Sequence, residues 1–276
     1  MTDSFQVCPL EPVHFEGAAD LMARAYNTEG FLERLTLQHT LEPQGCLGIW
    51  DSSVLVGTAF YIVYDSLAVV GLVATDPHLQ RRGVARAGME HLLNTLEHKE
   101  IRTVTLDASK AGQPLYQKLG FLKRGTSFVY KAGWTYAEPR ATPTRVAQPE
   151  DLEWMSALDQ EAVGGDRSRL LGAIFQEENV RVLTLKERGF AFVRGSTLGP
   201  VVAQTLEDAR ALFEATLSLE YRRAPVLCVP AQNLQVCNLL ENLGFELQRE
   251  FAYMEKGVAR AGNREFNWAL ASFALG

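Results

Sequence analysis

The sequence predicts an α/β or α+β protein in which helices and strands share a mixed sheet. Two observations support this class. Segments with apolar residues at helical spacing alternate along the chain with apolar runs of strand length. In addition, an order of strand, helix, Leu-Gly-Phe and strand occurs twice, with the tripeptide at residues 119–121 and 243–245. We therefore expect an internal duplication with a period near half of the 276 residues.

The first half contains the more regular patterns. Helices are predicted at residues 15–26, 31–40, 82–97 and 114–119, and strands at 46–50, 54–64, 67–75, 104–108 and 127–131. The strand at 67–75 is almost entirely apolar, which predicts a central position with both faces covered. Pro114 and Gly120 mark the start and the end of the fourth helix.

The second half repeats this order less clearly. Strands are expected at 199–202 and 226–229, and helices at 207–221 and along the apolar face of Val236, Leu239, Leu240 and Leu243. Between the halves, the stretch 132–144 contains two prolines and no clear period, which is typical of a linker. We therefore expect one domain at 1–135, a linker at 136–144 and a second domain at 145–276.

The composition argues against several classes of protein. With 47% hydrophobic and 22% charged residues, the chain resembles a soluble globular protein with a sizeable core. A net charge of -6 disfavours nucleic-acid binding. No apolar run is long enough for a membrane span, and residues 1–17 lack the features of a signal peptide, so we expect a cytoplasmic protein with reduced thiols. Neither the cysteines nor the histidines show a metal-binding spacing, so no metal site is expected.

Three arginines mark the most informative segment. Arg81, Arg82 and Arg86 lie at the start of the helix that follows the buried strand 67–75. Cations are disfavoured at the positive end of a helix unless an anion is bound there. Gly83 would let such an anion approach the backbone. The segment therefore predicts a phosphate or pyrophosphate site, with a solvated basic turn as the alternative.

The spacing within this segment identifies a family. The patterns GxxxxGK[ST] and GxGxxG are absent. The residues Gln80-x-x-Gly83-x-Ala85 resemble the [QR]-x-x-G-x-[GA] pyrophosphate loop of the GNAT acetyltransferases, and residues 106–121 look like the last catalytic strand and helix of that family. The resemblance covers residues 5–131, and the second half is a degenerate echo, as in a bacterial branch of tandem GNAT proteins.

The resemblance implies two GNAT-like domains, each a mixed, mostly antiparallel sheet flanked by helices. It also implies an N-acyltransferase that transfers acetyl from acetyl-CoA directly to an amine, and that transfers groups other than aminoacyl groups. Backbone groups of Val73, Ala74 and Thr75 would hold the pantetheine arm. The cofactor loop would consist of Gln80, Arg81, Arg82, Gly83, Val84, Ala85 and Arg86.

Further site residues follow from the same resemblance. Tyr116 matches the tyrosine that protonates the leaving thiolate, although packing is the alternative for an aromatic residue on a short helix. Ser109 stands where the family often has an asparagine that contacts pantetheine. Glu29 lies where early helices line the acceptor site, and it is the base we expect. The other carboxylates considered for that role are Asp76, Asp107, Asp159 and Asp166.

The second half is expected to lack a cofactor site. Thr205-x-x-Asp208 predicts a capping box where the first half has its arginine loop, and Leu240 replaces the tyrosine. We therefore expect one acetyl-CoA site per chain, with the second half forming a wall of the acceptor pocket. The acceptor is a small-molecule or peptide amine of unspecified identity, and a homodimer is left open. The alternatives are a non-catalytic acyl-CoA sensor, or an acyltransferase that uses a longer acyl group or an alcohol acceptor.

Overall fold

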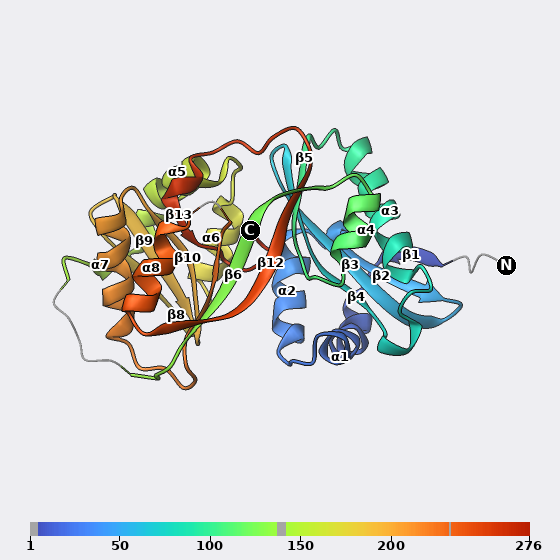
Figure 1. Cartoon of the computed structure of the whole chain (residues 1–276), viewed down its shortest axis with the longest axis horizontal. Helices are drawn as coiled ribbons and strands as arrows, with labels where there is room; N and C mark the ends of the chain where they lie inside the picture. The colour runs from blue at the N-terminus through green and yellow to red at the C-terminus, as the bar shows by residue number, and fades with distance from the viewer. Residues whose placement is uncertain (1–4, 137–141, 232) are drawn as a thin grey trace.

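The protein consists of two lobes joined by a pair of long strands (Figure 1). The computed structural model describes residues 5–136, 142–231 and 233–276. Helices and strands form a mixed α/β structure, which confirms the fold class predicted from the sequence. The central part of the expected linker, residues 137–141, lies outside the described residues. No helix of the described ranges is long and apolar enough to cross a membrane.

The first lobe is built from most of the first half of the chain. Its strands are β1 (Gln6–Pro9), β2 (Cys46–Asp51), β3 (Val54–Tyr64), β4 (Leu67–Thr75) and β5 (Thr103–Ala108), and its helices are α1 (Phe15–Tyr26), α2 (Phe31–Leu41), α3 (Val84–His98) and α4 (Gln113–Lys118). The predicted bounds of β3 and β4 match those in the structure. Strand β1 had not been predicted, because it is short and half-buried.

The second lobe repeats this plan. Its strands are β7 (Arg145–Val146), β8 (Val180–Thr184), β9 (Gly189–Arg194), β10 (Thr197–Ala203), β11 (Val226–Val229) and β13 (Asn267–Ala269), and its helices are α5 (Leu152–Val163), α6 (Ser168–Phe175), α7 (Leu206–Leu217) and α8 (Gln235–Asn242). The sequence had predicted β10, β11, α7 and α8.

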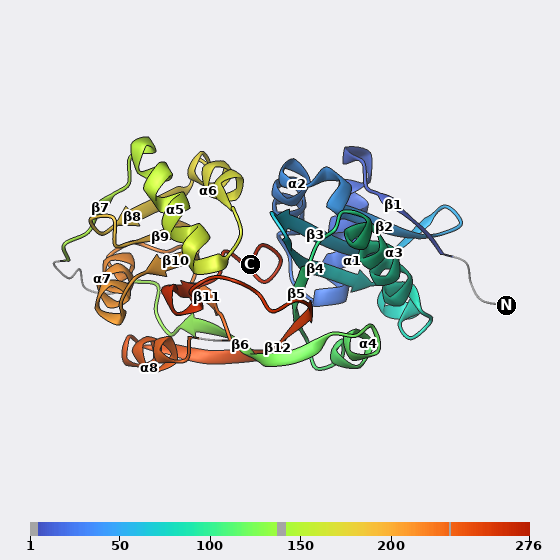
Figure 2. The ribbon, with the colours of Figure 1, turned by 90° about the horizontal axis from the view of Figure 1, so that it is seen from above.

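Two strands are exchanged between the lobes. Strand β6 (Leu122–Ala132) follows α4 but pairs with β11 of the second lobe, and β12 (Phe245–Gly257) follows α8 but pairs with β5 of the first lobe. The two strands also pair with each other along most of their length. As a result, one sheet runs through both lobes in the order β1-β2-β3-β4-β5-β12-β6-β11-β10-β9-β8-β7. Figure 2 shows this two-stranded bridge with α4 near one end and α8 near the other.

The repeated Leu-Gly-Phe has the same structural role in both lobes. Gly120 and Gly244 have φ angles of 88° and 81°, a left-handed conformation that ends α4 and α8. The phenylalanines that follow, Phe121 and Phe245, are buried. Each tripeptide therefore stops a helix and directs the chain into an exchanged strand.

Candidate active site

The candidate site lies where two parallel strands separate. Strands β4 and β5 pair only from Leu67 to Val70 and from Thr103 to Leu106. Beyond this point, a bulge in β4 places Leu72 at a φ angle of 49°, and the Thr58 hydroxyl donates to the Leu72 carbonyl across the bulge. Because no residue of β5 pairs with the last five residues of β4, the two strands are not joined by hydrogen bonds beyond this point, and we refer to this unpaired stretch as the opening.

The opening leads to the loop that carries the arginines. The first backbone hydrogen bond of α3 runs from Ala87 to Gly83, so the N–H groups of Val84, Ala85 and Arg86 have no acceptor within the helix. Gly83 has a φ angle of 92°, and a Cβ atom at this position would meet nothing within 4 Å. The first turn contains no acidic residue.

The arginines of the loop face solvent. Arg81, Arg82 and Arg86 are exposed, and none forms an ion pair within the described part of the chain. Arg81 has a φ angle of 66°, which is uncommon for a residue with a side chain. The arrangement is that of an anion site, in which unpaired N–H groups, a helix dipole and free cations surround open space.

Tyr116 lies on α4 and packs in the same hydrophobic cluster as Val73 of β4 and Ala108 of β5. The side chain is 8% exposed and packs edge-on against Phe121. Burial raises the pKa of its hydroxyl to about 12, so the phenol keeps its proton at neutral pH. The hydroxyl has no hydrogen-bond partner among the described residues, and it is therefore free to donate to a ligand in the opening.

A second tyrosine, which the sequence did not reveal, borders the same opening. Tyr26 ends α1, stacks on Phe31 with a centroid distance of 5.4 Å, and donates its hydroxyl proton to the Val73 carbonyl at 2.8 Å. Burial raises the pKa of Tyr26 well above its usual range, and the Tyr116 hydroxyl raises it further. Tyr26 therefore contacts the unpaired part of β4. Only the path of α1 across β4 brings Tyr26 to Val73, so no local pattern marked this tyrosine.

Ser109 stabilises the turn before α4. Its hydroxyl accepts a hydrogen bond from the Gly112 N–H at 3.2 Å, and its carbonyl accepts from Gly112 and Gln113. The hydroxyl proton is not used in these bonds. Ser109 could therefore donate one hydrogen bond to a ligand while it continues to hold the turn.

The carboxylates considered for the base lie in different surroundings. Glu29 is exposed in the loop between α1 and α2. Asp76 accepts from the His78 N–H and pairs with Arg24 at 3.1 Å, so it caps the short turn before the arginine loop. Asp159 forms a fully buried ion pair with Arg167, and Asp166 accepts from the Ser168 N–H. Asp76, Asp159 and Asp166 therefore have structural roles. Asp107 is half-buried near the end of β5.

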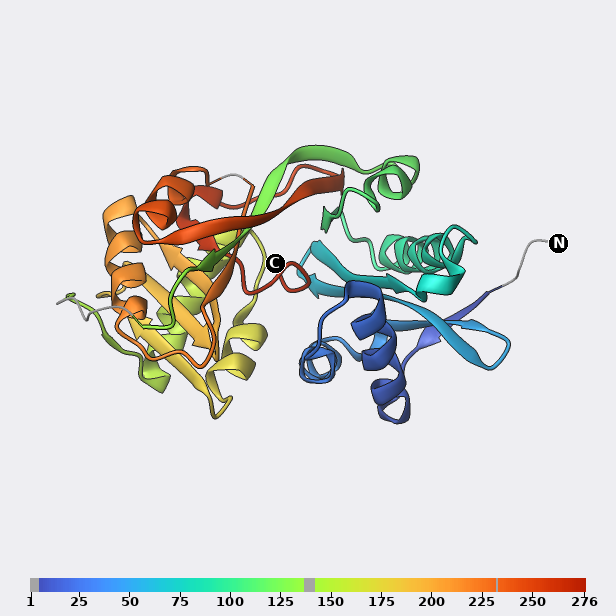
Figure 3. The same cartoon turned by 60° about the horizontal axis from the view of Figure 1, so that its bottom comes forward.

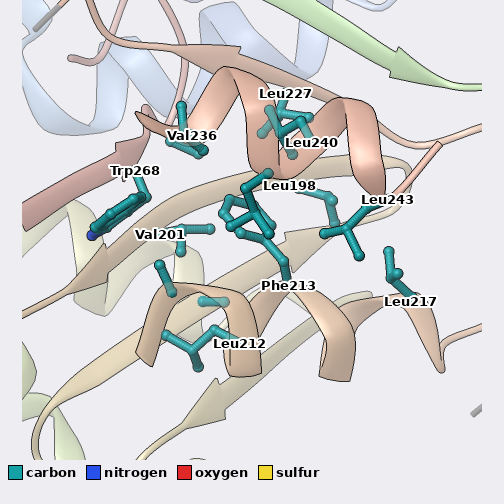
Figure 4. Close-up of a cluster of buried hydrophobic side chains, with 14 of the residues drawn as sticks. Leu198, Val201, Leu212, Phe213, Leu217, Leu227, Val236, Leu240, Leu243 and Trp268 are labelled. Atoms are coloured by element: carbon teal, nitrogen blue, oxygen red, sulfur yellow. The ribbon is translucent and has the colours of Figure 1, made fainter. Parts of the chain in front are cut away.

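The matching opening in the second lobe is filled by the chain itself. Strands β10 and β11 pair only at Thr197 and Leu198, and β13 then pairs with Val201 and Val202. The Trp268 side chain of β13 is buried in the core of this lobe (Figure 4), where its indole N–H donates to the Ala203 carbonyl at 2.8 Å. Strand β13 therefore occupies the place that β4 leaves open in the first lobe.

The helix start in the second lobe is also closed. The Thr205 hydroxyl accepts from the Asp208 N–H at 3.1 Å, which confirms Thr205 as the cap of α7, but the Asp208 carboxylate accepts from the Thr205 hydroxyl at 2.8 Å and not from the Thr205 N–H, so the predicted capping box is only half formed. Glu207 and Asp208 add negative charge to the first turn. Leu240, which corresponds to Tyr116, is buried. The cap occupies the Asp208 N–H group, and the two acidic side chains make the charge of this helix start unfavourable for an anion.

Comparison with known protein families identifies the family to which this fold belongs. Residues 15–121 match the model of the acetyltransferase (GNAT) family, and residues 155–266 match a second model, described as an acetyltransferase (GNAT) domain. Together the two matches cover more than half of the chain. The chain belongs to the GNAT acetyltransferase family and carries one such domain in each half, which confirms the resemblance found in the sequence.

Known proteins share this two-domain plan. The chain is 25% identical over 227 residues to the uncharacterized N-acetyltransferase YitH of Bacillus subtilis, with 78% of each chain covered. It is similar in fold to a putative acetyltransferase from Pyrococcus horikoshii, with a TM-score of 0.88, 22% identity, and coverage of 99% of this chain and 96% of that one. A GNAT protein from Sphaerobacter thermophilus gives a TM-score of 0.69 at 16% identity, with coverage of 94% and 96%.

A shorter match concerns an enzyme with a named substrate. Over 52 residues, the chain is 40% identical to the [ribosomal protein bS18]-alanine N-acetyltransferase of Escherichia coli. The match covers 18% of this chain and 35% of that protein.

Proposed function

We propose that the protein is an acetyl-CoA-dependent N-acyltransferase with one active site per chain, located in the first lobe. The observation that carries this proposal is the opening between β4 and β5, which ends at an uncapped, arginine-flanked helix start. The second lobe has the same fold without the opening or the free helix start. Comparison of the two lobes therefore separates the features of the cofactor site from those of the fold that both lobes share.

The residues around the opening fit acetyl-CoA. The backbone of Val73, Ala74 and Thr75 lies along the unpaired stretch of β4, where an extended pantetheine arm could add as a strand. The N–H groups between Arg81 and Arg86 suit a pyrophosphate, and the open space at Gly83 lets it approach. Ser109 can donate to the arm from the β5 side. The cosubstrate supplies a thioester that an amine can cleave.

Three side chains of the first lobe would take part in the reaction. Tyr116 holds a proton that it can deliver to a departing sulfur atom, because its raised pKa keeps the phenol protonated. Tyr26 fixes the Val73 carbonyl at the mouth of the opening. The sequence predicts Glu29 as the base, and its side chain is exposed in the loop between α1 and α2, where it could attract a cationic amine.

The proposal includes the nature of the partners. The acceptor is a small-molecule or peptide amine, and neither nucleic acid nor membrane is required. The YitH-like and GNAT relationships favour turnover over an acyl-CoA sensor. The named substrate of the shorter match makes an N-terminal alanine one reasonable acceptor to include. The exclusion of aminoacyl transfer stays a prediction.

Release of the CoA thiol tests the proposal. Purified protein is mixed with acetyl-CoA and a panel of polyamines, amino acids, aminoglycosides and alanine-terminated peptides, and free thiol is measured over time. Steady release that depends on one acceptor class is expected. Release with alcohols in place of amines, or with long-chain thioesters in place of acetyl-CoA, would support the alternative acyltransferases. Tight acetyl-CoA binding without turnover on any acceptor would support the sensor.

A further inference from the structure

Asp107 carries a buried carboxylate oxygen with no partner. The residue lies on β5, one position before the strand ends. Its Oδ1 atom is buried and has no partner at hydrogen-bond distance among the described residues, and the same is true of the Ser127 hydroxyl on β6, which lies close enough to lower the pKa of the carboxyl but not to form a regular hydrogen bond with it. Buried polar atoms are nearly always satisfied, since each unpaired one costs free energy. An unpaired carboxylate therefore points to a ligand that completes it.

The position of Asp107 relates it to the opening. Leu106 is the last residue of β5 that pairs with β4, so Asp107 follows at the point where the strands separate. Side chains alternate along a strand. Leu106 and Ala108 pack with Tyr116 in the core under α3, so Asp107 faces the other side of the sheet. A group in the opening would have Tyr116 on one face and Asp107 on the opposite face.

Both lobes contribute to the small cavity at Asp107. The first half of the chain supplies Thr105 and Ser127, and the second half supplies Tyr253, Arg260, Arg264 and Gly276. The space is about that of one water molecule, which is also the size of an ammonium head group. The segment that follows β13 runs between the two lobes (Figure 3), and its residues Leu270 and Gly276 line the cavity.

We propose that Asp107 binds the ammonium group of a primary-amine acceptor and takes one of its protons. An N–H bond of the ammonium breaks, an O–H bond forms on the carboxylate, and the nitrogen keeps the electron pair with which it can attack a carbonyl. The proton then leaves to solvent. This inference rests on the proposed function, and it assigns to Asp107 the role that the sequence had given to Glu29.

The surroundings of Asp107 suit a proton acceptor. Burial raises the pKa of its carboxyl to about 7, against smaller lowering effects of the Ser127 hydroxyl and the two arginines of the cavity. The other titratable groups that face it are the Cys228 thiol of β11 and the Tyr253 phenol of β12. The carboxylate is therefore present above pH 7 and is lost below it.

The two arginines of the cavity have other partners. Arg264 pairs with Glu255 at 3.2 Å, and Arg260 donates to the Val163 carbonyl at 3.0 Å. Neither forms an ion pair with Asp107. Both act on the Asp107 carboxyl through space and lower its pKa without binding it, so its oxygens stay available to an incoming ammonium group, which an alcohol acceptor lacks.

Carboxyl NMR tests the binding step without turnover. In protein labelled at the aspartate Cγ, the Asp107 signal, assigned by its loss in Asp107→Asn, should titrate near pH 7. n-Butylammonium chloride should shift that midpoint to lower pH, because the cation stabilises the carboxylate, whereas n-butanol should not. A signal that titrates near pH 4, or one that ignores n-butylammonium at saturation, would overturn the inference.

Kinetics test the catalytic step. Asp107→Asn should lower kcat/KM for the accepted amine by ~10²-fold or more, remove the activity rise around pH 7, and leave acetyl-CoA affinity unchanged. Asp107→Glu should restore part of the rate, and the matched control Asp20→Asn, exposed on α1, should behave as wild type. If Asp107→Asn still showed the rise of kcat/KM around pH 7 and Glu29→Gln did not, the base would be Glu29. If the wild type showed no turnover, but n-butylammonium still shifted the Asp107 midpoint to lower pH, only the proposed function would be contradicted.

Discussion

Two tyrosines and one carboxylate surround the point where β4 and β5 separate. Tyr116 approaches from α4, Tyr26 from the end of α1, and Asp107 from β5 itself. Each is held by a different element, and Tyr26 is far from the other two in sequence. The chemistry of the site therefore depends on the bulge at Leu72 and the short pairing of β4 with β5, which together set the width of the opening.

The Tyr116 hydroxyl is predicted to act as the acid. Tyr116→Phe keeps the ring that packs on Phe121 and removes only the hydroxyl. We expect kcat to fall by ~10²–10⁴-fold, with little change in acetyl-CoA affinity. Because burial raises the pKa of Tyr116 to about 12, the wild type should show no loss of the acid between pH 7 and pH 10. Wild-type turnover in the variant would make Tyr116 a packing residue.

The Gly83 position is predicted to contact the pyrophosphate. Gly83→Asp would place a negative charge in the open space at the start of α3 and should abolish acetyl-CoA binding in calorimetric titration. The left-handed φ angle strains any side chain here, so Gly83→Asn serves as the matched control. The asparagine variant should bind more weakly than wild type but measurably. Equal affinities of a folded Gly83→Asp protein and the wild type would exclude this site.

At the scale of elements, β13 distinguishes the two lobes. It forms hydrogen bonds with β10 and β11 where the first lobe has none, and it places Trp268 in the core. A strand that belongs to the chain has a large advantage over a free ligand, because it is always present at high effective concentration. The second lobe thus keeps the GNAT fold while its cleft is permanently occupied.

One acetyl-CoA molecule should bind each chain. Strand β13 and the capped start of α7 remove the second site, so calorimetry of the whole protein should give a stoichiometry of one. Arg82→Glu, in the loop of the first lobe, should weaken this binding, whereas Arg188→Glu, close to α7, should not change it. Arg188 pairs with Asp208, so the control removes a comparable exposed arginine from the second lobe. Two equivalent sites would contradict the prediction.

At the scale of the molecule, the exchanged strands make the lobes interdependent. Strand β12 lies between β5 and β6, and β6 lies between β12 and β11, so neither lobe completes its sheet from its own half of the chain. The domain limits expected from the sequence follow the duplication, but the structural units cross them at this bridge. The cavity at Asp107 is one result, because it includes residues from both halves.

The whole chain is predicted to unfold as one unit. Urea unfolding followed by circular dichroism and by tryptophan fluorescence should give coincident transitions. Ala252→Pro, in the middle of β12, removes a ladder hydrogen bond between β5 and β6 and should cost about 3 kcal/mol or more. It should also weaken acetyl-CoA binding, although residue 252 lies in the second half. Leu206→Pro, at the first position of α7, should change neither quantity. Two separate transitions in the wild type would show independent lobes.

Local patterns predicted the elements and the loop, but not the contacts between distant segments. Strand β4 was predictable because its apolar run ends at clear turn residues. The arginine loop was predictable because its arginines and Gly83 follow a recognisable spacing. The exchange of β6 and β12 was not, because each follows the same tripeptide and either could pair within its own half. Tyr26 and Asp107 were undervalued for a related reason, since their importance depends on where β4 and β5 separate.

The bridge also determines the order in which the protein can be made. Strand β6 leaves the ribosome about a hundred residues before β12, the strand that must lie between it and β5. Until then, β5 has an open edge on one side and β6 lacks both of its neighbours. The first lobe, which holds the proposed active site, can therefore be completed only after β12 has been made. A chain truncated before β12 would have no finished first lobe and should be inactive.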